Sequence, residues 1–436
     1  MIRIGRLPEN DAANGWSNIL APRAPNAPLK GNVTADWLVI GAGYAGLAAA
    51  RRLAENRPNE SVVIVDACAV GDGASARNSG FVIDLPHNVG GDGDDHEGPF
   101  RALRLARAAS RWLGEIVETH RIDCQWSPVG QYMAAASDAG MAALDGFRAE
   151  LEAVNEPYET ITDPRPRIGT DRYRELVHAP TVVLMQPASL VRGLAATLPE
   201  NVTLYENAPV IGIDFADPVR AETPGGTIAA GGCILAVNGF APDFGVLKNR
   251  IFPVMLFCSI TRPLTDAEHD AMGCPADWGV VPSLPFGGPT IRYTQDRRLT
   301  MRSRFAYRPG MKATAGDYRK ARALQERQLK DRYPHLPDDI IEHTWSGCIA
   351  LAQNFAPGFG RHAENVWTAV CQNGVGVTKG TIAGQLAADM ATGRDNPLMA
   401  DMEALGTPSK LPPRPFRDIG IMASFRKFAW DARAEV

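Results

Sequence analysis

Apolar and polar residues follow a regular order near the start of the chain. Residues 36–40 (DWLVI) form a short apolar run, an apolar stretch of helical character follows, and residues 61–66 (SVVIVD) form a second apolar run that ends in an acid. Short apolar runs bounded by glycine are typical of strands buried on both faces of a parallel sheet. The pattern therefore predicts a strand, a helix and a second parallel strand.

Segments with the hydrophobic period of a helix and segments with that of a strand alternate along the rest of the chain. Helices are predicted over residues 97–125, 141–155, 188–198, 316–331 and 382–390, and strands over 128–133, 182–187, 202–213, 232–237 and 251–260. Residues 290–305 predict a hairpin, in which a period of two places Met301, Ser303 and Phe305 on one face and Arg302 and Arg304 on the other. The chain is therefore expected to be of the α/β class.

The turn after the first predicted strand carries three glycines in the sequence GAGYAG, residues 41–46. Gly41 permits the tight turn, Gly43 lets the backbone approach a pyrophosphate, and Gly46 lets the helix lie close to the strand. The helix N-terminus presents free N–H groups to phosphates. Asp66 ends the second strand, where a carboxylate accepts hydrogen bonds from a ribose. These features predict a dinucleotide site, and an acid in place of Arg disfavours NADP.

Two further segments suit the same ligand. Residues 71–81 (GDGASARNSGF) are mostly small, so their backbone can run beside a flat molecule, although composition alone would also suit a flexible surface loop. Residues 365–381 repeat the order of strand, glycine turn and helix. The N-terminus of that helix can stabilise negative charge.

Composition limits the alternatives. The 436 residues allow two to three domains at about 150 residues each. The net charge of −4 gives no basic surplus for nucleic acid or an anionic membrane. No run reaches the roughly 18 apolar residues of a membrane span, and the N-terminus lacks the apolar core of a signal peptide. The seven scattered cysteines contain no CxxC pair, which predicts a reducing compartment, namely the cytoplasm, and no metal site.

The chain resembles the flavin amine oxidases of the D-amino-acid oxidase superfamily, in particular the branch with gamma-glutamylputrescine oxidase, glycine oxidase and monomeric sarcosine oxidase. The glycine turn with Asp66, the GASARNSGF run, the segment Trp345–Gly347 and the second glycine turn carry the resemblance. It implies a Rossmann-like FAD-binding domain with an inserted mixed-sheet α+β substrate domain. It also implies non-covalently bound FAD, a small-molecule amine substrate, and O2 or another electron acceptor.

The implied division of the chain is discontinuous. Residues 1–33 form an N-terminal arm, and residues 34–86, 186–245 and 345–400 form the FAD-binding domain. Residues 87–185 and 246–344 form the substrate domain, and residues 401–436 form a C-terminal tail without an assigned role.

The resemblance implies an extended set of FAD-binding residues along these segments: Gly41, Gly43, Tyr44, Ala45, Gly46, Asp66, Ala67, Gly73, Ala74, Ser75, Arg77, Asn78, Ser79, Gly80, Val210, Asn238, Gly347, Asn373, Gly374, Val375, Gly376, Val377 and Thr378. At Val210 the implied contact is made by the backbone. Cys348 lies close to the position of the flavin-linked cysteine of sarcosine oxidases, but we interpret it as a structural thiol.

Substrate and catalytic residues are expected in the inserted domain. Arg292 is a candidate cation near the flavin N5, where it would assist oxygen reduction, and His87 is a candidate to face the ring. Arg302, Arg304 and Tyr293 are candidates to bind an anionic substrate group, because arginine forks match carboxylate or phosphate. A solvated basic edge and a packing histidine are the alternatives. Many relatives carry glycine where Arg302 and Ser303 stand, so the substrate is not transferable from them.

Three other functions fit parts of this pattern. The first is an FAD-dependent amine dehydrogenase that passes electrons to an acceptor other than O2. The second is an NAD-linked dehydrogenase, which would need neither the second glycine turn nor the GASARNSGF run. The third is a flavin-binding subunit without turnover.

Overall fold

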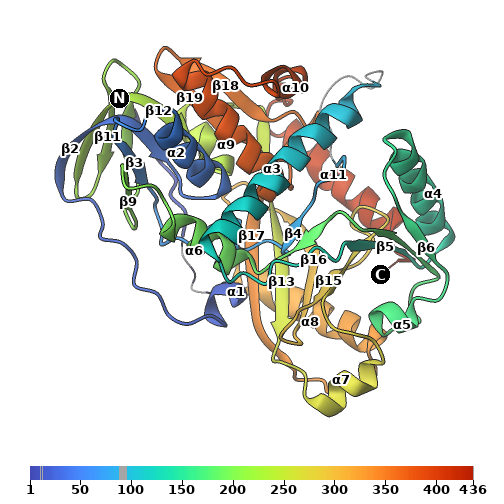
Figure 1. The fold of residues 1–436 in the computed structure, drawn as a ribbon. Helices are drawn as coiled ribbons and strands as arrows, with labels where there is room; N and C mark the ends of the chain where they lie inside the picture. The colour runs from blue at the N-terminus through green and yellow to red at the C-terminus, as the bar shows by residue number, and fades with distance from the viewer. Residues whose placement is uncertain (10, 12, 88–95, 436) are drawn as a thin grey trace.

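The computed structural model describes residues 1–9, 11, 13–87 and 96–435. Two large sheets organise these residues, with helices packed on them (Figure 1). None of the described helices combines the length and the apolar composition that crossing a bilayer requires.

The first sheet has a parallel centre with the order β9-β3-β2-β12-β19. Its strands are β2 (Gly31–Ile40), β3 (Val62–Val65), β9 (Val202–Tyr205), β12 (Gly226–Leu235) and β19 (Val366–Val370). Antiparallel strands extend it, namely β1 (Ile2–Arg3), β10 (Gly212–Asp214), β11 (Val219–Thr223) and β18 (Gly358–Ala363). The predicted strand, helix and parallel strand at the start of the chain are β2, α2 (Tyr44–Asn56) and β3.

Both faces of this sheet are covered, which explains the continuous apolar runs. On one face α2 packs with α9 (Gly376–Thr392), α3 (Gly98–His120) and α6 (Pro187–Ala196) around residues such as Val39 and Ile64. On the other face Leu38 and Val63 pack against β10 to β12 and the 3-10 helix η2 (Asn238–Phe244). We had assigned α3 to the substrate domain, but its apolar side belongs to the core of the first sheet.

The second sheet has the order β17-β13-β16-β15-β14-β5-β7-β6, and only its β14–β5 pair is parallel among the described strands. The strands are β5 (Gln131–Ala135), β6 (Glu159–Ile161), β7 (Glu175–Ala179), β13 (Ile251–Thr261), β14 (Trp278–Pro282), β15 (Thr290–Tyr293), β16 (Leu299–Tyr307) and β17 (Ile341–Ala352). The short ladder of β4 (Phe81–Val82) with β8 (Val183–Leu184) runs between the two sheets. Because β17 pairs with β13 from residue 341 to residue 352, our boundary at residue 345 cuts through a strand of the second sheet.

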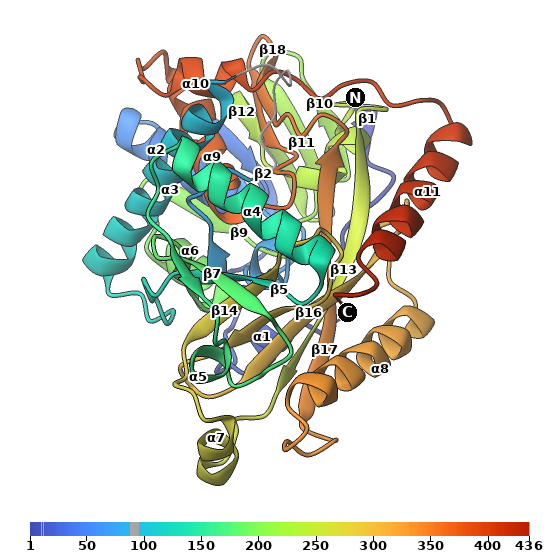
Figure 2. The same cartoon turned by 90° about the vertical axis from the view of Figure 1, so that its right-hand side faces the viewer.

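Four of the described helices lie beside the second sheet, namely α4 (Asp138–Ala153), α5 (Arg165–Ile168), α7 (Asp266–Met272) and α8 (Ala315–Arg332). The residues after 400 contact elements of both domains. α10 (Met399–Ala404) packs on α3, and α11 (Phe416–Asp431) lies along the outside of the second sheet, at the right edge of Figure 2. The N-terminal arm contributes α1 (Gly15–Asn18), whose Trp16 is buried.

Candidate functional site

The parallel strands of the first sheet end at one edge. β2 ends at Ile40, β3 at Val65, β12 at Leu235 and β19 at Val370, and these ends are in register. The glycine turn, Asp66, Asn238 and the second glycine turn follow these ends directly. Ligands of open parallel sheets bind at such an edge. The topology therefore brings together segments that lie more than 300 residues apart along the chain.

The first glycine turn has no room for side chains. Gly41 has a φ of +105°, and a Cβ atom on it would lie 2.7 Å from the Ala236 carbonyl oxygen. A Cβ atom on Gly46 would overlap the Gly41 carbonyl oxygen, which brings α2 against its strand. A Cβ atom on Gly43 would lie 2.5 Å from Ser75 Oγ, which accepts a 3.2 Å hydrogen bond from Tyr44 N. No glycine side chain covers the backbone at this turn, so a ligand can approach the backbone closely.

Asp66 is held beside this turn by backbone donors. Its carboxylate accepts hydrogen bonds from Ala42 N at 2.7 Å and Cys68 N at 2.8 Å. Burial raises the pKa of Asp66, and the negative charges of Glu206 and Asp72 act in the same direction. The carboxylate is thus placed at the end of β3 in a desolvated setting where further hydrogen-bond donors would stabilise its charge.

The second glycine turn is shaped by two asparagines. Asn373 accepts a 2.8 Å hydrogen bond from Ala352 N and donates one of 2.8 Å to the Phe355 carbonyl. Asn238 accepts a 3.1 Å bond from Cys371 N. Both amides therefore support the turn, and a direct FAD contact by either remains a prediction. Gly374, with a φ of +85°, is exposed.

Helices α2 and α9 bring the two turns together. A Cβ atom on Gly380 would lie 3.6 Å from Ala45 N, and one on Gly384 would overlap the Ala45 carbonyl oxygen. α9 therefore packs along α2 from near the N-terminus of each helix, as far as the Arg52 and Asp389 ion pair, so the two N-termini lie close together. Two helix N-termini at one site favour an anionic group such as a diphosphate or a reduced ring.

The GASARNSGF segment is fixed in place and is not a loose surface loop. Arg77 donates to the carbonyls of Asp72 at 2.7 Å and Ser346 at 3.0 Å and forms an ion pair with Asp11. Trp16 Nε1 donates a 2.9 Å bond to the Asn78 carbonyl. The Arg77 side chain thus binds protein, and a role of Arg77 in FAD binding would fall to its backbone.

One face of β17 looks towards this segment. Trp345 Nε1 donates a 3.2 Å bond to the Arg77 carbonyl, and a Cβ atom on Gly347 would lie 3.3 Å from Arg77 Cβ. Strand alternation turns Cys348 to the other face, where it packs in the cluster of Phe257, close to α8. Burial raises the pKa of the Cys348 thiol to about 12, so the thiol is neutral at pH 7. This placement agrees with a structural thiol.

Arg292 is the most buried cation at the site. It is fully buried, its Nη1 donates to the carbonyls of Gly80 at 3.1 Å and of Met185, and its Cζ lies 5.7 Å from the Trp16 ring centre. Nε and Nη2 have no hydrogen-bond partner among the described residues. Burial lowers the pKa of Arg292 to about 10, although Asp277 and Asp296 oppose this shift.

A β-bulge separates the two hairpin arginines, which corrects our prediction that they share a face. The register of β13 with β16 shifts where Phe257 pairs with Ser303 and Leu256 with Phe305, so Arg304 is the extra residue, with a φ of +61°. Arg304 forms an ion pair with Asp317 of α8. Arg304 is therefore engaged with protein, and its predicted contact with substrate remains a prediction that this ion pair does not support.

The Arg302 side chain lies on the inner face of the second sheet, which is the face towards the core around Trp16. It pairs across strands with Cys258, a member of the core that contains Trp16, and its Cζ lies 5.2 Å from the Phe305 ring centre. Its Nη2 donates to Thr290 Oγ1. No carboxylate among the described residues pairs with Arg302, and burial lowers its pKa to about 10.

Tyr293 lies on the opposite side of the sheet from Arg292. It is fully buried in a second core, and its hydroxyl lies 2.7 Å from His269 Nδ1 of α7. Neighbouring residues of a strand point to opposite faces, so Tyr293 and Arg292 cannot both face the site. The structure therefore places Tyr293 away from Arg292, and its predicted contact with substrate remains a prediction that this placement does not support.

Lys379 is a third cation at the inner face, beside Arg292 and Arg302, and the neutral His87 lies next to it. Lys379 Nζ donates a 2.7 Å bond to the His87 carbonyl. Burial and the charges of Lys379 and Arg302 lower the pKa of His87 to about 4, and burial lowers that of Lys379 to about 8. His87 and Arg302 nevertheless keep accessible surface. We call Arg292, Arg302 and Lys379, together with the neutral His87, the cationic cluster.

The arrangement fits FAD. Buried polar atoms without partners among the described residues include Tyr44 Oη, Gln372 Oε1 and two nitrogens of Arg292. A Cβ atom on Gly73 or Gly376 would meet no other atom within 4 Å, so the backbone there faces open space. Val210 lies close to Asp66, since Ala208 N donates to the Asp66 carbonyl at 2.8 Å. The other predicted FAD contacts, Ala67 and Ser79 among them, remain predictions.

Sequence reasoning missed two parts of this site. Trp16 belongs to a segment that we interpreted as an irregular arm, and a lone tryptophan in a Pro- and Asn-rich stretch was the available signal. The second part is Lys379, at the start of the helix after the second glycine turn, which from the sequence could contribute charge or simply be exposed. No group of three or more His, Cys, Asp or Glu suited to a metal occurs among the described residues.

Comparisons with known proteins agree with this geometry. The model of the family "FAD dependent oxidoreductase" matches residues 36–390. A probable oxidoreductase, OrdL, of Rhizobium meliloti is 30% identical over 88% of this chain and 89% of its own length. Gamma-glutamylputrescine oxidoreductase of Escherichia coli is 27% identical over 90% of each chain. The crystal structure of glycine oxidase from Geobacillus kaustophilus superposes with a TM-score of 0.69 at 18% identity, covering 87% of this chain and 100% of that one, which supports the fold.

Proposed function

This chain belongs to the family of FAD-dependent oxidoreductases, and from that premise we propose that it oxidises the C–N bond of a primary or secondary amine that carries an anionic group. Relatives named for amines and amino acids support the amine class. Bound FAD supplies the hydride acceptor, and we propose O2 as the final electron acceptor.

The observation that supports an anionic group on the substrate is that Arg302 has no carboxylate partner among the described residues. A guanidinium that has lost much of its contact with water and lacks a carboxylate partner is costly unless a bound anion compensates it. Arg302 lies at the inner face with a neutral Thr290 hydroxyl as its hydrogen-bond partner and the Phe305 ring below it. An arginine in this setting binds a substrate carboxylate or phosphonate through two parallel hydrogen bonds.

The same charges help the amine to react. An amine must lose its proton before hydride can leave the neighbouring carbon. The positive charges of Arg292, Arg302 and Lys379 disfavour the protonated form of an amine bound nearby. The apolar walls around Trp16 add a desolvation cost to that ammonium form. These charges and apolar walls therefore lower the pKa of the bound ammonium. His87 has a pKa of about 4, so it is neutral at pH 7 and adds no positive charge beside the amine, and the proton that leaves passes to water.

Arg292 supports the choice of O2. Its fixed positive charge, buried behind Gly80, favours negative charge on a reacting oxygen molecule. The alternative is a dehydrogenase that passes electrons to a carrier, and peroxide release separates the two. We also propose a cytoplasmic location, which the seven unpaired cysteines in the described residues support.

The test is an amine panel in matched pairs, assayed by anaerobic bleaching of the bound flavin. Each pair contains an amine with a carboxylate or phosphonate and the same amine without it, such as N-methylglycine with N-methylethylamine and aminomethylphosphonate with methylamine. The anionic member should bleach the flavin faster, and peroxide should appear on admission of air. Equal or faster bleaching by the neutral members would contradict the anionic class, and no bleaching by any amine would contradict the function.

A further inference from the structure

The C-terminal helix α11 presents an unusual surface. None of its residues, all of which are described, is buried. Phe416 is 70% exposed, Ile419 58%, Met422 46% and Trp430 66%. Residues 416, 419, 423, 426 and 430 follow helical spacing, so these apolar side chains share one side of the helix with Arg426. Large apolar side chains gathered in this way mark an interaction surface.

The helix is nevertheless fixed to the protein. Before it, Leu411 N donates a 2.7 Å bond to the Asn249 carbonyl. Along it, Phe425 and Phe428 lie 5.1 Å and 5.4 Å from the Phe286 ring centre. After it, the buried carboxylate of Glu435 accepts hydrogen bonds from the backbone at the start of α4. The exposed apolar side therefore belongs to an element that is anchored at both ends.

The charge of this segment differs from that of the rest of the chain. Residues 408–436 carry six basic and three acidic side chains, a surplus of three positive charges in a chain whose net charge is −4. The acids are engaged, because Asp418 binds the Tyr307 hydroxyl and Asp431 pairs with Lys427. Arg414 and Arg417 pair with Asp418, and Lys427 pairs with Asp431, whereas Lys410 and Arg426 have no carboxylate partner among the described residues.

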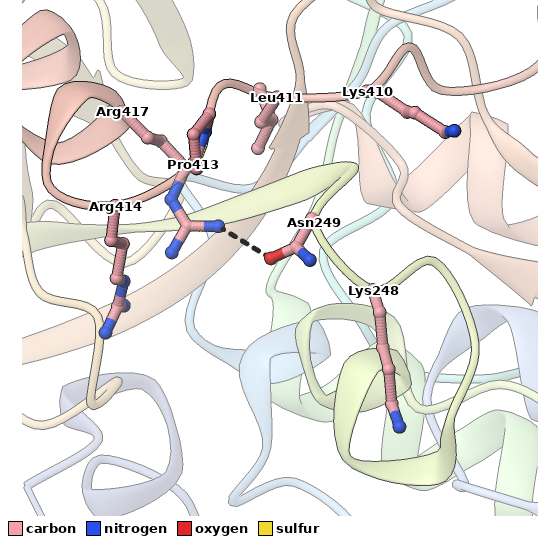
Figure 3. A pocket seen from close by; sticks show the side chains of 7 residues that line it. All are labelled: Lys248, Asn249, Lys410, Leu411, Pro413, Arg414 and Arg417. Atoms are coloured by element: carbon pink, nitrogen blue, oxygen red, sulfur yellow. Dashed lines mark hydrogen bonds between the residues drawn. The ribbon is translucent and has the colours of Figure 1, made fainter.

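A basic groove lies at the start of the helix (Figure 3). It has a volume of about 690 Å³ and is lined by Lys248, Asn249, Lys410, Leu411, Pro413, Arg414 and Arg417. Lys248 and Lys410 are exposed, and neither has a carboxylate partner among the described residues. The groove therefore offers cations to a phosphate group beside the apolar side of α11.

We propose that the C-terminal segment 408–431 docks on an anionic phospholipid bilayer. A helix with Trp, Phe and Ile on one side and Lys and Arg beside them lies in the plane of a bilayer interface, where tryptophan is favoured and basic residues attract anionic headgroups. The basic groove binds headgroups, and Phe416, Ile419 and Trp430 enter the acyl boundary. A second copy of the chain fits less well, because an isologous contact through this surface would set like charges against each other.

The experiment is vesicle co-sedimentation of the purified holoenzyme. Phosphatidylcholine vesicles should bind little, and vesicles with about 30% phosphatidylglycerol should bind strongly at low salt. The variant K248Q/K410Q should bind the anionic vesicles about 30-fold more weakly, because each basic residue near such a surface contributes roughly a fivefold factor. The variant F416S/I419S/W430S should lose binding. The flavin absorbance of both variants should stay unchanged, because these residues lie outside the site.

The control variants are K30Q/K320Q and V129S, which remove exposed lysines and an exposed apolar side chain elsewhere. Both should bind like the parent protein. Brominated lipids should quench a fluorescence component that W430F lacks. Equal binding to neutral and anionic vesicles, equal losses in the control variants, or a dimer in solution that only F416S/I419S/W430S dissociates would overturn the proposal.

Discussion

Gly384 of α9 lies against the backbone of Ala45 of α2, so closely that a Cβ atom on Gly384 would overlap the Ala45 carbonyl oxygen. This contact sets the distance between two helices that begin at the two glycine turns. The glycine at residue 384 therefore determines whether both helix N-termini reach one bound molecule.

We expect Gly384→Ala to push the helices apart. The variant should lose about 1–3 kcal/mol of unfolding free energy, as overpacked core positions do, and should retain less FAD than the parent protein. Thermal unfolding and the flavin-to-protein absorbance ratio measure these effects. Gly146→Ala in α4 is the control, since its Cβ atom meets nothing within 4 Å and alanine should stabilise the helix by up to ~1 kcal/mol. An unaltered flavin ratio in Gly384→Ala would contradict the convergence of the two turns.

Asp66→Ala should weaken the retention of FAD. The carboxylate that orders Ala42 N and Cys68 N is lost, together with its expected hydrogen bonds to the ribose. Hydrogen bonds to a charged group contribute roughly 1.5–3 kcal/mol, so we expect affinity for FAD to fall about 10- to 100-fold. Flavin release during gel filtration and titration of the apoprotein check this. Asp36→Ala removes an acid from the opposite end of the same sheet and should keep its flavin.

Arg302 and Arg304 offer a matched pair. Arg302→Gln should lower kcat/KM for anionic amines about 10- to 100-fold and leave neutral amines nearly unchanged, because it removes a charge-assisted fork from the cationic cluster. Arg304→Gln removes the same side chain on the outer face, where it pairs with Asp317, and should affect stability more than substrate choice. Steady-state kinetics with one matched amine pair distinguishes them. If both variants discriminated against anionic amines equally, the role of the bulge in separating them would be refuted.

Lys379 should give the protein a measurable pH dependence. Burial lowers its pKa to about 8, below its value in the unfolded chain, so between about pH 8 and 10.5 the unfolded state binds more protons than the native state. Stability attributable to Lys379 therefore rises with pH across this window. The advantage of Lys379→Met over the parent apoprotein, measured by urea unfolding, should shrink as pH increases from 8 to 10. A pH-independent difference would show that Lys379 is not desolvated, and Lys320→Met, an exposed lysine of α8, serves as control.

Local patterns predicted most of the elements. The predicted helices 97–125, 141–155, 188–198, 316–331 and 382–390 correspond to α3, α4, α6, α8 and α9. The first glycine turn was identified together with its strand and helix, since each part is short-range: apolar period, bare backbone and a following acid. The family and its cofactor followed from these motifs and are confirmed by the comparisons.

The predictions that the structure does not support share a different cause. Arg304 and Tyr293 were assigned by counting along a strand, but the bulge at Arg304 arises from pairing with β13, and the face of Tyr293 depends on which side of the sheet meets the first domain. The boundary at residue 345 and the domain of α3 failed for the same reason. The net charge of −4 also hid the basic surplus of residues 408–436, because a sum over the chain loses position.

By itself the sequence determined the segments that repeat a local rule: a strand, a glycine turn, a helix N-terminus and an acid at a strand end. Backbone sterics and hydrogen bonding within a few residues require them, whatever surrounds them. Only the tertiary structure decided which cations face inward, how α9 meets α2 at Gly384 and where α11 lies. Those outcomes depend on contacts between residues far apart in the chain, and the pairing of distant strands leaves no mark in either partner alone.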